Sequence, residues 1–505
     1  MQSVANKNTT LSRRFKIFFL ISGFSLPLKP YFIKMKFITY ITFFSLLLAL
    51  FFSCKKDNFI TDSSAKLEFS TDTVMFDTVF TTIGSTTQQF KIYNRHNEFV
   101  KVSSIYLANG NTTKFRLNIN GIRATKIENV EIPPKDSLFI FVEVTLDPNN
   151  TNNPLAIIDS MVCVTNGNVQ DVKLVAFGQD VHLIKGQIIQ SQTWNNDKPY
   201  LVYNSMLVDS LHTLTINAGT KIYFHRGSTM YVKGNLVVNG TKDNPVIFRN
   251  DRLEHVYDDI PSQWNGILLF SGSNNNNIEY AEIKNAVIGL QVGNIEHSGG
   301  AILELKNSKI ENNSYAGVFA IASDIKAYNC VFANAGYYTT AIIAGGSYEF
   351  YHCTFANYWT STRSEPSVIL SNNVTIGETM YLGNLTKSYF GNCIIWGNNS
   401  NEIGFSNEEG VDFNYKFDHC VLKIDAAVNT SDEANYLNIL KNQDPKFKST
   451  YKNFDFQLDT LSPVIDKGNI SIVNLFPAFL NTDINQNYRN NDAAPDPGAY
   501  ERKEN

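Results

Sequence analysis

The sequence predicts an all-β protein whose larger part is a right-handed parallel β-helix, a solenoid, preceded by a β-sandwich. Three observations predict the solenoid. A short pattern repeats between positions 278 and 424, apolar residues alternate within each copy, and an asparagine recurs at one point of the pattern.

The repeat consists of a small residue followed two positions later by a large apolar one. The small residues occupy positions 281, 308, 330, 353, 393 and 420, which gives successive intervals of 27, 22, 23, 40 and 27. An interval of about 20 to 27 residues is typical of one solenoid turn. Apolar residues two positions apart indicate strands, because successive side chains of a strand point to opposite faces. The copies are therefore expected to stack as parallel strands around a common interior.

Two columns of the repeat are predicted to form structural ladders. Four residues after the small position, the first four copies carry asparagine: Asn285, Asn312, Asn334 and Asn357. Stacked amides donate to and accept from the copies above and below, which satisfies polar groups at a sharp corner. The last four small positions are cysteines: Cys330, Cys353, Cys393 and Cys420. Stacked Cβ vectors run parallel and disfavour disulfide geometry, so buried free thiols are expected.

The start of the chain contains a targeting signal. Residues 35–53 combine a short basic start, an apolar run and a small residue directly before Cys54. This pattern resembles a bacterial lipoprotein signal peptide, and the Ser-Cys-Lys-Lys-Asp junction resembles those of Bacteroidetes-type lipoproteins. The resemblance implies that Met35 rather than Met1 is the true start and that residues 1–34 are an upstream extension outside the mature protein.

The same resemblance implies a lipid anchor at Cys54, with the membrane as a partner and residues 54–65 as the tether. The expected location is the bacterial outer membrane, facing either the cell surface or the periplasm. An uncleaved membrane anchor is the alternative. No second long apolar stretch follows, so the rest of the chain is not expected to be embedded in a membrane.

Residues 66–180 are predicted to form the β-sandwich. Strand-like runs recur about every ten residues, separated by turn residues such as Asn109-Gly110 and Asn166-Gly167. The stretch from Ile132 to Leu138, followed by alternating apolar residues, resembles immunoglobulin-like domains of bacterial surface proteins. We expect an antiparallel sandwich that acts as a spacer between the membrane and the solenoid.

Residues 181–440 are assigned to the β-helix and residues 441–505 to its C-terminal cap. Positions 210 to 295 resemble the opening coils of bacterial right-handed β-helix proteins. The last stretch, ending in Asp496-Pro-Gly-Ala-Tyr-Glu501, resembles the closing module of secreted members of that group. Such a module is expected to cover the open end of the solenoid. Five of its residues are expected to tie it together: Asp466, Asp483, Arg489, Asp496 and Glu501.

Composition excludes one class of partner and leaves catalysis weakly supported. The net charge is −4 and 18% of residues are charged, so there is no basic footprint for nucleic acid. A polysaccharide lyase needs a base and a neutraliser for the uronate carboxylate, commonly Ca²⁺ on several carboxylates, and a hydrolase needs two carboxylates in one groove. The outward columns between 278 and 424 lack such a cluster, and we interpret them as solvated faces.

The loop from Arg249 to Asp259 is the best charged candidate. If it is catalytic, the residues are Arg249, Arg252, Glu254 and His255. If it binds a cation, the ligands are Asp251, Asp258 and Asp259. An ordinary solvated loop is the alternative.

Aromatic residues just past the corners are candidates for stacking on sugar rings: Tyr337, Tyr338, Tyr358 and Trp359. Ordinary packing is the alternative. The coil between Cys353 and Cys393 is much longer than the others, so a loop is expected to leave the stack within 358–385. Long loops on a rigid scaffold are common places for binding sites.

The sequence therefore favours a lipid-anchored envelope protein that binds a polysaccharide or a cell-surface glycan, or acts as an adhesive surface protein, without catalysis and without a cofactor. The first alternative is a polysaccharide lyase or glycoside hydrolase acting on an acidic polysaccharide, with Ca²⁺ if it is a lyase. The second is a purely structural envelope protein. The family resemblance covers all three, because β-helix scaffolds host lyases, hydrolases and adhesins.

Overall fold

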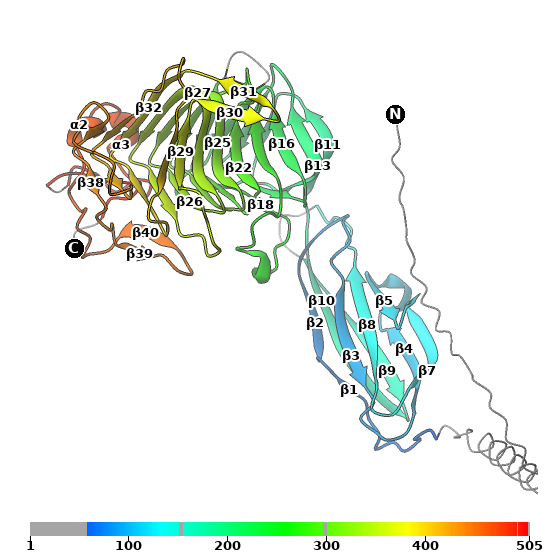
Figure 1. Ribbon diagram of the computed structural model, residues 1–505. Helices are drawn as coiled ribbons and strands as arrows, with labels where there is room; N and C mark the ends of the chain where they lie inside the picture. The colour runs from blue at the N-terminus through cyan, green and yellow to red at the C-terminus, as the bar shows by residue number, and fades with distance from the viewer. Residues whose placement is uncertain (1–57, 151–154, 296–299, 492, 503–505) are drawn as a thin grey trace, which may run out of the picture.

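The computed structural model describes residues 58–150, 155–295, 300–491 and 493–502. Figure 1 shows a β-sandwich joined to a rod of stacked strands, with the C-terminal residues packed against the far part of the rod. The predicted signal peptide and the lipidation site Cys54 lie outside the described residues. Among the described residues, no helix is both long enough and apolar enough to cross a membrane.

The N-terminal domain consists of two five-stranded sheets packed face to face. The first contains β1 (Glu68–Phe69), β3 (Gln88–Tyr93), β8 (Ser137–Val144), β5 (Phe115–Ile119) and β6 (Ile122–Ala124). The second contains β2 (Thr73–Phe80), β10 (Asn168–Gln179), β9 (Leu155–Thr165), β4 (Val100–Leu107) and β7 (Lys126–Ile132). A short 3-10 helix, η1 (Gly110–Thr112), follows β4.

Alternating apolar residues of the two sheets form the core of this sandwich, as the immunoglobulin-like prediction requires. In β8, Leu138, Ile140, Val142 and Val144 all point inward. Two details differ from the sequence prediction. β2 pairs with β10 in parallel, so the sandwich is not purely antiparallel. The strands β6 and β7 were not predicted, because Ile122–Ile132 is largely exposed and lacks strict apolar alternation.

The rod is a network of 26 strands that follow one another along three parallel sheets, so the predicted parallel β-helix is confirmed. Several strands bend at a corner and contribute to two sheets. Sheet 1 contains β12 (Gln192–Trp194), β14 (Thr213–Asn217), β17 (Asn235–Asn239), β20 (Asn276–Glu279), β23 (Ile302–Lys306), the later halves of β25 (Ala316–Tyr328) and β27 (Tyr338–Tyr351), β32 (Leu385–Gly391), β35 (Lys416–Asp418) and β37 (Tyr436–Leu437).

Sheets 2 and 3 complete each coil. Sheet 2 contains the first halves of β11 (His182–Ile189) and β13 (Tyr200–Val208), then β15 (Lys221–Phe224), β18 (Val246–Asn250), β21 (Ala281–Lys284), β24 (Lys309–Asn313), β26 (Val331–Ala335), β28 (Thr354–Asn357), β33 (Ile394–Gly397), β36 (Val421–Leu422) and β38 (Leu440–Lys441). Sheet 3 contains the later halves of β11 and β13, then β16 (Thr229–Val232), β19 (Gly266–Leu269), β22 (Ile288–Val292), the first halves of β25 and β27, β29 (Val368–Ser371) and β34 (Ile403–Ser406).

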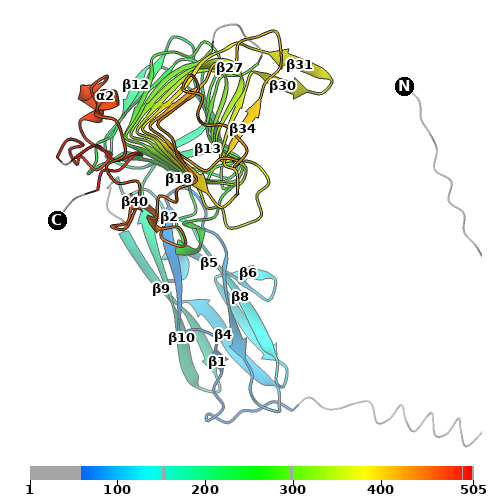
Figure 2. The same cartoon turned by 60° about the vertical axis from the view of Figure 1, so that its left-hand side comes forward.

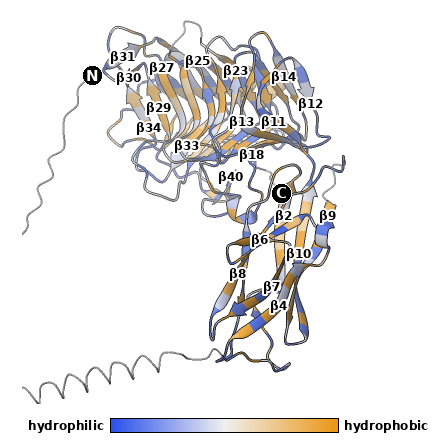
Figure 3. Cartoon of the chain, turned by 90° about the vertical axis from the view of Figure 1, so that its right-hand side faces the viewer, coloured by the Kyte–Doolittle hydropathy of each residue, from blue (hydrophilic) through white to orange (hydrophobic). Residues whose placement is uncertain are grey.

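The predicted register is confirmed inside the rod. Ile283 pairs with Ile310, and the column continues through Phe332, Phe355 and Ile395. Phe332 and Phe355 stack with their ring centroids 4.9 Å apart. Hydrophobic residues follow the strands of both domains in Figure 3, which fits a core that runs along the whole rod.

The cysteine column forms the expected file of buried thiols. Cys330, Cys353, Cys393 and Cys420 are all fully buried and free. The backbone N–H of Cys353 donates to Sγ of Cys393 at 3.4 Å, and that of Cys393 donates to Sγ of Cys420 at the same distance. Equivalent residues of successive coils therefore lie directly over one another.

The asparagine ladder is present in its first coils and changes form in the later ones. Nδ2 of Asn312 donates to Oδ1 of Asn285 at 2.8 Å, and Asn285 donates in turn to Asn250, a rung that the sequence analysis missed. Asn334 and Asn357 keep the register but bond to backbone: Asn334 accepts from the N–H of Tyr358, and Asn357 bonds both backbone groups of Ala335. Each amide still satisfies backbone or side-chain groups at this corner.

The long coil leaves the stack twice, within the predicted range. Residues 358–367 form a loop between β28 and β29, and β30 (Asn373–Ile376) with β31 (Thr379–Leu382) forms a hairpin before β32. Figure 2 shows this hairpin projecting from the rod. Its side chains Ile376, Met380, Tyr381 and Leu382 are exposed.

The C-terminal module contains β39 (Phe447–Ser449), β40 (Asp455–Leu458), α2 (Ile470–Val473) and α3 (Pro477–Leu480). Four of the five residues expected to tie it together do so through their side chains, whereas Asp466 contributes only its backbone N–H. Arg489 is fully buried and donates to Glu501 at 3.1 Å, Asp483 accepts from the N–H groups of Asn487 and Glu501, and Asp496 accepts from those of Asp466 and Arg502.

The module lies in a different place from the one that the sequence predicts. It was expected over the open end of the solenoid, but its contacts run back along the side of the rod: Arg489 Nη2 donates to Asn329 at 2.9 Å, and the N–H of Ala499 donates to Thr354. The reason is the outward face of sheet 2. The prediction of a solvated face is wrong for Val331 and Thr354, which are each 1% exposed beneath the module.

Candidate functional site

The outward face of sheet 3 carries no charged residue in its central column. The paired residues of that column are Leu207, Tyr231, Leu268, Gln291, Phe319, Ala341, Ile369 and Gly404. Their inward neighbours, such as Leu290 and Val318, fill the rod. The alternation that builds the core therefore leaves an apolar and aromatic strip on the outside of this sheet.

An aromatic cluster borders this strip and consists of Tyr315, Phe319, Tyr337, Tyr338 and Trp359. The ring centroids of Tyr315 and Tyr337 are 5.0 Å apart, and those of Tyr315 and Phe319 are 5.7 Å apart. A Cβ added at Gly336 would lie 3.5 Å from the Trp359 ring, so this ring lies against the backbone of Gly336, the residue before Tyr337. Tyr337 is 46% exposed, which leaves part of its ring available to a ligand.

Hydrogen bonds and an ion pair fix the loop that carries Trp359. Arg363 donates to both carboxylate oxygens of Glu402, at 2.6 and 2.9 Å, and both side chains are almost fully buried. Burial raises the pKa of Glu402, while Arg363 opposes that change. Tyr338 donates to Glu365 of the same loop at 3.0 Å. The pKa of the Tyr338 hydroxyl is raised, mainly by burial and further by the neighbouring Glu365 carboxylate. The cluster is therefore held on a rigid support.

Of the four predicted ligand-binding aromatics, Tyr337 and Tyr338 pack together and Trp359 lies against the neighbouring Gly336, whereas Tyr358 lies elsewhere. Its ring packs against Phe447 and Phe456 of the C-terminal module, with centroid distances of 6.2 and 6.1 Å. Tyr315 and Phe319 also belong to the cluster but were not predicted from the sequence. Tyr315 precedes Tyr337 by one repeat interval, so the periodicity contained the signal.

The predicted catalytic loop from Arg249 to Asp259 lies at the junction with the β-sandwich. Arg249 pairs with Asp258 at 2.9 Å, and Arg252 forms a two-pronged pair with Glu254. Glu254 also accepts from Thr86 of the sandwich at 3.5 Å. Leu253 packs in an apolar cluster with Phe80 of β2 and Tyr223 of β15. The loop thus contributes to the contact between the two domains.

The predicted metal ligands do not converge. Asp251 accepts from His225 Nδ1 at 2.7 Å, Asp258 is shared between Arg249 and His255, and Asp259 pairs with Lys284 at 3.2 Å. Burial raises the pKa of Asp251, and the bond from His225 acts in the opposite direction. Within the described residues, no group of three or more His, Cys, Asp or Glu side chains is arranged to bind a metal ion.

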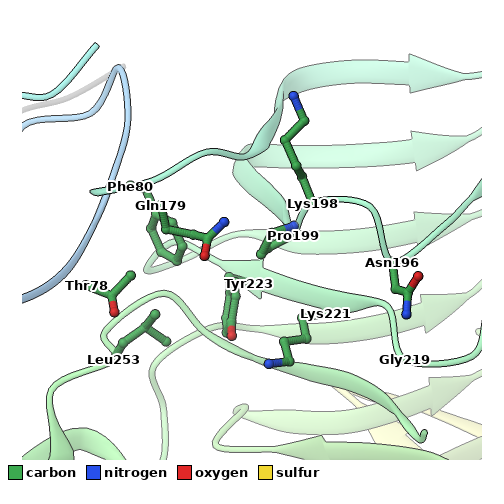
Figure 4. A pocket seen from close by; sticks show the side chains of 10 residues that line it. All are labelled: Thr78, Phe80, Gln179, Asn196, Lys198, Pro199, Gly219, Lys221, Tyr223 and Leu253. Carbon is green, nitrogen blue, oxygen red and sulfur yellow. The ribbon is translucent and has the colours of Figure 1, made fainter. Parts of the chain in front are cut away.

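A cavity of about 490 Å³ lies beside this loop, between the β-sandwich and the first coils. Thr78, Phe80 and Gln179 line it from the sandwich side, and Lys198, Lys221 and Tyr223 are among its residues from the rod (Figure 4). The rings of Phe80 and Tyr223 meet across the junction with their centroids 5.3 Å apart. We call this cavity the junction pocket.

Comparison with known proteins supports the fold of the rod. A family model described as a pectate-lyase-like β-helix domain matches residues 186–303, which run from β11 to β23. No curated protein matches the chain. The match covers the first coils and ends before the aromatic cluster.

Solved structures similar to part of the chain include a PapD-like domain of human CEP192 (12% identity, TM-score 0.17, 25% of this chain and 92% of that one) and the periplasmic chaperone SfaE (11%, 0.17, 23% and 58%). A family 123 glycoside hydrolase from Clostridium perfringens is also similar (7%, 0.17, 26% and 30%). At these scores the likenesses carry no argument about function.

Proposed function

We propose that this protein is a lipid-anchored envelope protein that binds glycans through the outward face of sheet 3, without catalysis. The observation that carries the proposal is the aromatic cluster on an uncharged strip. A sugar ring presents C–H groups on its faces and hydroxyls at its edge, and partly exposed Tyr and Trp rings offer a matching apolar body with a polar tip. The rod provides several such positions along its length, which suits a chain of sugar units.

The distribution of carboxylates also supports binding over hydrolysis. A hydrolase needs two carboxyl groups about 5 to 9 Å apart on one groove. Glu365 adjoins the aromatic cluster and accepts from Tyr338, whereas Glu402 is fully buried in its pair with Arg363. The central column of sheet 3 contributes no carboxylate.

A glycan array tests this proposal, with Tyr337→Ala and Trp359→Ala as the site variants. Tyr451→Ala is the matched control, because Tyr451 is an exposed tyrosine of the C-terminal module, away from sheet 3. We expect both site variants to lose at least tenfold in affinity for the glycans that the wild type retains, and the control to keep them. Equal binding by all four proteins would remove the aromatic cluster as the site.

The pectate-lyase-like match favours one second candidate, a lyase or hydrolase of an acidic polysaccharide. A lyase would require Ca²⁺ or another neutraliser of the uronate carboxylate. Incubation with a panel of acidic polysaccharides, with and without Ca²⁺, would reveal unsaturated products by their absorbance. Product formation would replace the binding proposal. If neither glycan binding nor products are found, a purely structural envelope role remains.

The proposed location rests on the signal pattern before Cys54. Mass spectrometry of the mature N-terminus is the direct measurement. A lipid-modified Cys54 is expected, and a protein that begins at Met1 would contradict the anchor. Protease shaving of intact cells then distinguishes the cell surface from the periplasm.

A further inference from the structure

A carboxylate without a cationic partner lies beside the aromatic cluster. Glu365 is half-buried in the loop between β28 and β29. Its Oε2 accepts from the Tyr338 hydroxyl at 3.0 Å, and its Oε1 accepts from the Ser364 hydroxyl at 3.4 Å. Both donors are neutral groups, so neither contact offsets the negative charge of Glu365.

The arginine of this loop does not neutralise Glu365. Arg363 donates to both carboxylate oxygens of Glu402, and it reaches only the backbone oxygen of Glu365. Within the part of the chain that the structure describes, Glu365 forms no ion pair. The central column of sheet 3 carries no charged residue either. A half-buried anion without a counter-charge attracts a cationic group, because partial burial reduces screening by water.

The three tyrosines beside Glu365 are inclined to one another. The ring centroid of Tyr315 lies 5.0 Å from that of Tyr337 and 6.3 Å from that of Tyr338, and the last two are 6.3 Å apart. The ring planes of these pairs meet at 41°, 84° and 43°. Coplanar rings form a platform for the face of a sugar, whereas inclined rings offer several π-faces to one compact group.

A compact cation is the group that such rings attract. The quadrupole of an aromatic ring draws a cation that lies within about 6 Å of the ring centroid. The carboxylate acts on the same rings: the pKa of the Tyr315 hydroxyl is raised by burial, then by Tyr337 and Glu365. Aromatic rings and an uncompensated carboxylate thus adjoin each other at one corner of the rod, and both favour positive charge.

We propose that the aromatic cluster and Glu365 together bind an ammonium group, so that the preferred ligand is a glycan with free amino groups. This inference rests on the glycan binding proposed above and names the ligand class of the same site. The ammonium group contacts the Glu365 carboxylate and the tyrosine rings, and the body of the sugar packs on the exposed ring of Tyr337. A uronate unit is repelled from the same position by Glu365.

Isothermal titration calorimetry with two trisaccharides tests the inference. The glucosamine trimer carries amines, and the N-acetylglucosamine trimer has the same ring skeleton without their charge. We expect the wild type to bind the amino trimer about tenfold more tightly, because only the amine gains the ion pair and the cation–π contacts. Equal affinities, tighter binding of the acetylated trimer, or no binding of either trimer would overturn the inference.

Glu365→Gln removes the charge and keeps an oxygen that accepts from Tyr338. This variant should bind the amino trimer about fivefold more weakly and the acetylated trimer as the wild type does. Glu143→Gln is the matched control, because Glu143 is also a half-buried glutamate and accepts from the Thr87 hydroxyl at 2.9 Å, but it lies on β8 of the sandwich. It should bind both trimers normally. Unchanged affinity of Glu365→Gln for the amino trimer would exclude Glu365 from the site.

The pH dependence provides a second readout in the unmodified protein. Raising the pH until the amine of the ligand loses its proton should remove the preference for the amino trimer, while the affinity for the acetylated trimer stays constant. A preference that persists with the uncharged amine would contradict recognition of an ammonium group.

Tyr337→Ala separates this inference from the proposed function. It should weaken both trimers, because it removes the exposed ring on which either sugar packs. If the glycan array finds ligands that require Tyr337 but calorimetry shows no preference for the amine, glycan binding stands and the ammonium inference fails. Full retention of both trimers by Tyr337→Ala would remove the aromatic cluster as the site and overturn both.

Discussion

Sheets 2 and 3 of the same rod both present apolar residues to the outside, but the chain covers only one of them with its own C-terminal module. On sheet 2, Val331, Ile394 and Val421 point outward and are at most 1% exposed, because the module packs over them. On sheet 3, Tyr231, Leu268 and Phe319 occupy the equivalent outward column and remain half-buried. An outward apolar column therefore has two uses in this fold: to receive another part of the chain or to stay available for a ligand.

A matched pair of substitutions gives the largest expected contrast between the two faces. Val331→Asp places a carboxylate beneath the module and should cost about 5 kcal/mol, enough to remove a cooperative unfolding transition. Phe319→Asp, on the other face of the same coil, should cost about 1 kcal/mol, because water reaches that position. Thermal unfolding followed by circular dichroism measures both. Similar losses would mean that sheet 3 is covered as well.

The second largest loss of stability is expected when the C-terminal module is detached from the rod. Arg489→Ala removes the cation that pairs with buried Glu501 and the donor to Asn329 Oδ1, and should cost about 3 to 5 kcal/mol. Limited proteolysis should release the C-terminal residues of the variant before the rod is cut. Arg363→Ala, which breaks the buried ion pair with Glu402 in the rod, is the control. It should leave the order of proteolytic cleavage as in the wild type. Identical digestion patterns for the wild type and Arg489→Ala would contradict the assignment.

The unfolding free energy should also depend on pH through Asp496 of the C-terminal module. Burial raises the pKa of Asp496 from 3.8 to about 6, so the folded protein binds this proton more tightly than the unfolded chain does. The contribution of Asp496 to stability is complete at low pH and is lost as the pH rises from the ordinary pKa through the raised one. Between about pH 5 and pH 7 this loss amounts to about 1 kcal/mol. Asp496→Asn should flatten this part of the profile of unfolding free energy, and an unchanged slope would exclude Asp496 as its source.

The smallest effect on stability is expected at the exposed aromatics of sheet 3. Tyr337→Ala should change the unfolding free energy by less than about 0.5 kcal/mol, because almost half of this side chain is already in water. Chemical denaturation measures this change directly. A loss above about 2 kcal/mol, the size typical of a buried packing position, would show that Tyr337 supports the fold and would favour the packing alternative over a binding role.

The rod could be predicted from sequence because its determinants are local and periodic. The interval between Ser308 and Cys330 fixes which strands pair, and the same register places Asn285 under Asn312. Position in the repeat then decides which side chains face inward. The position of Trp359 near Tyr337 was harder to predict from the repeat. It depends on a loop that is fixed by the ion pair between Arg363 and Glu402, which lie 39 residues apart in the sequence.

The contacts that could not be predicted from the sequence are those that the rod makes with the β-sandwich and with the C-terminal module. The repeat of the rod does not extend into either of them. Glu254 and Leu253 contact the sandwich through residues more than 160 positions earlier, and no repeat relates the two segments. Tyr358 was grouped with Trp359 because the two are neighbours in the chain, yet its ring faces Phe456 of the module. The covered state of Val331 depends on the same module, so the column appeared to be solvated.

The return of the C-terminal module to the middle of the rod also sets an order for folding. Arg489 contacts Asn329, 160 residues earlier in the chain, so the outward face of sheet 2 stays uncovered until the ribosome has passed Arg489. A chain that terminates before Arg489 would stack its coils but leave the apolar outward face of sheet 2 exposed. Chaperones and proteases recognise such exposed apolar surface. Synthesis of the module and burial of this face are therefore coupled.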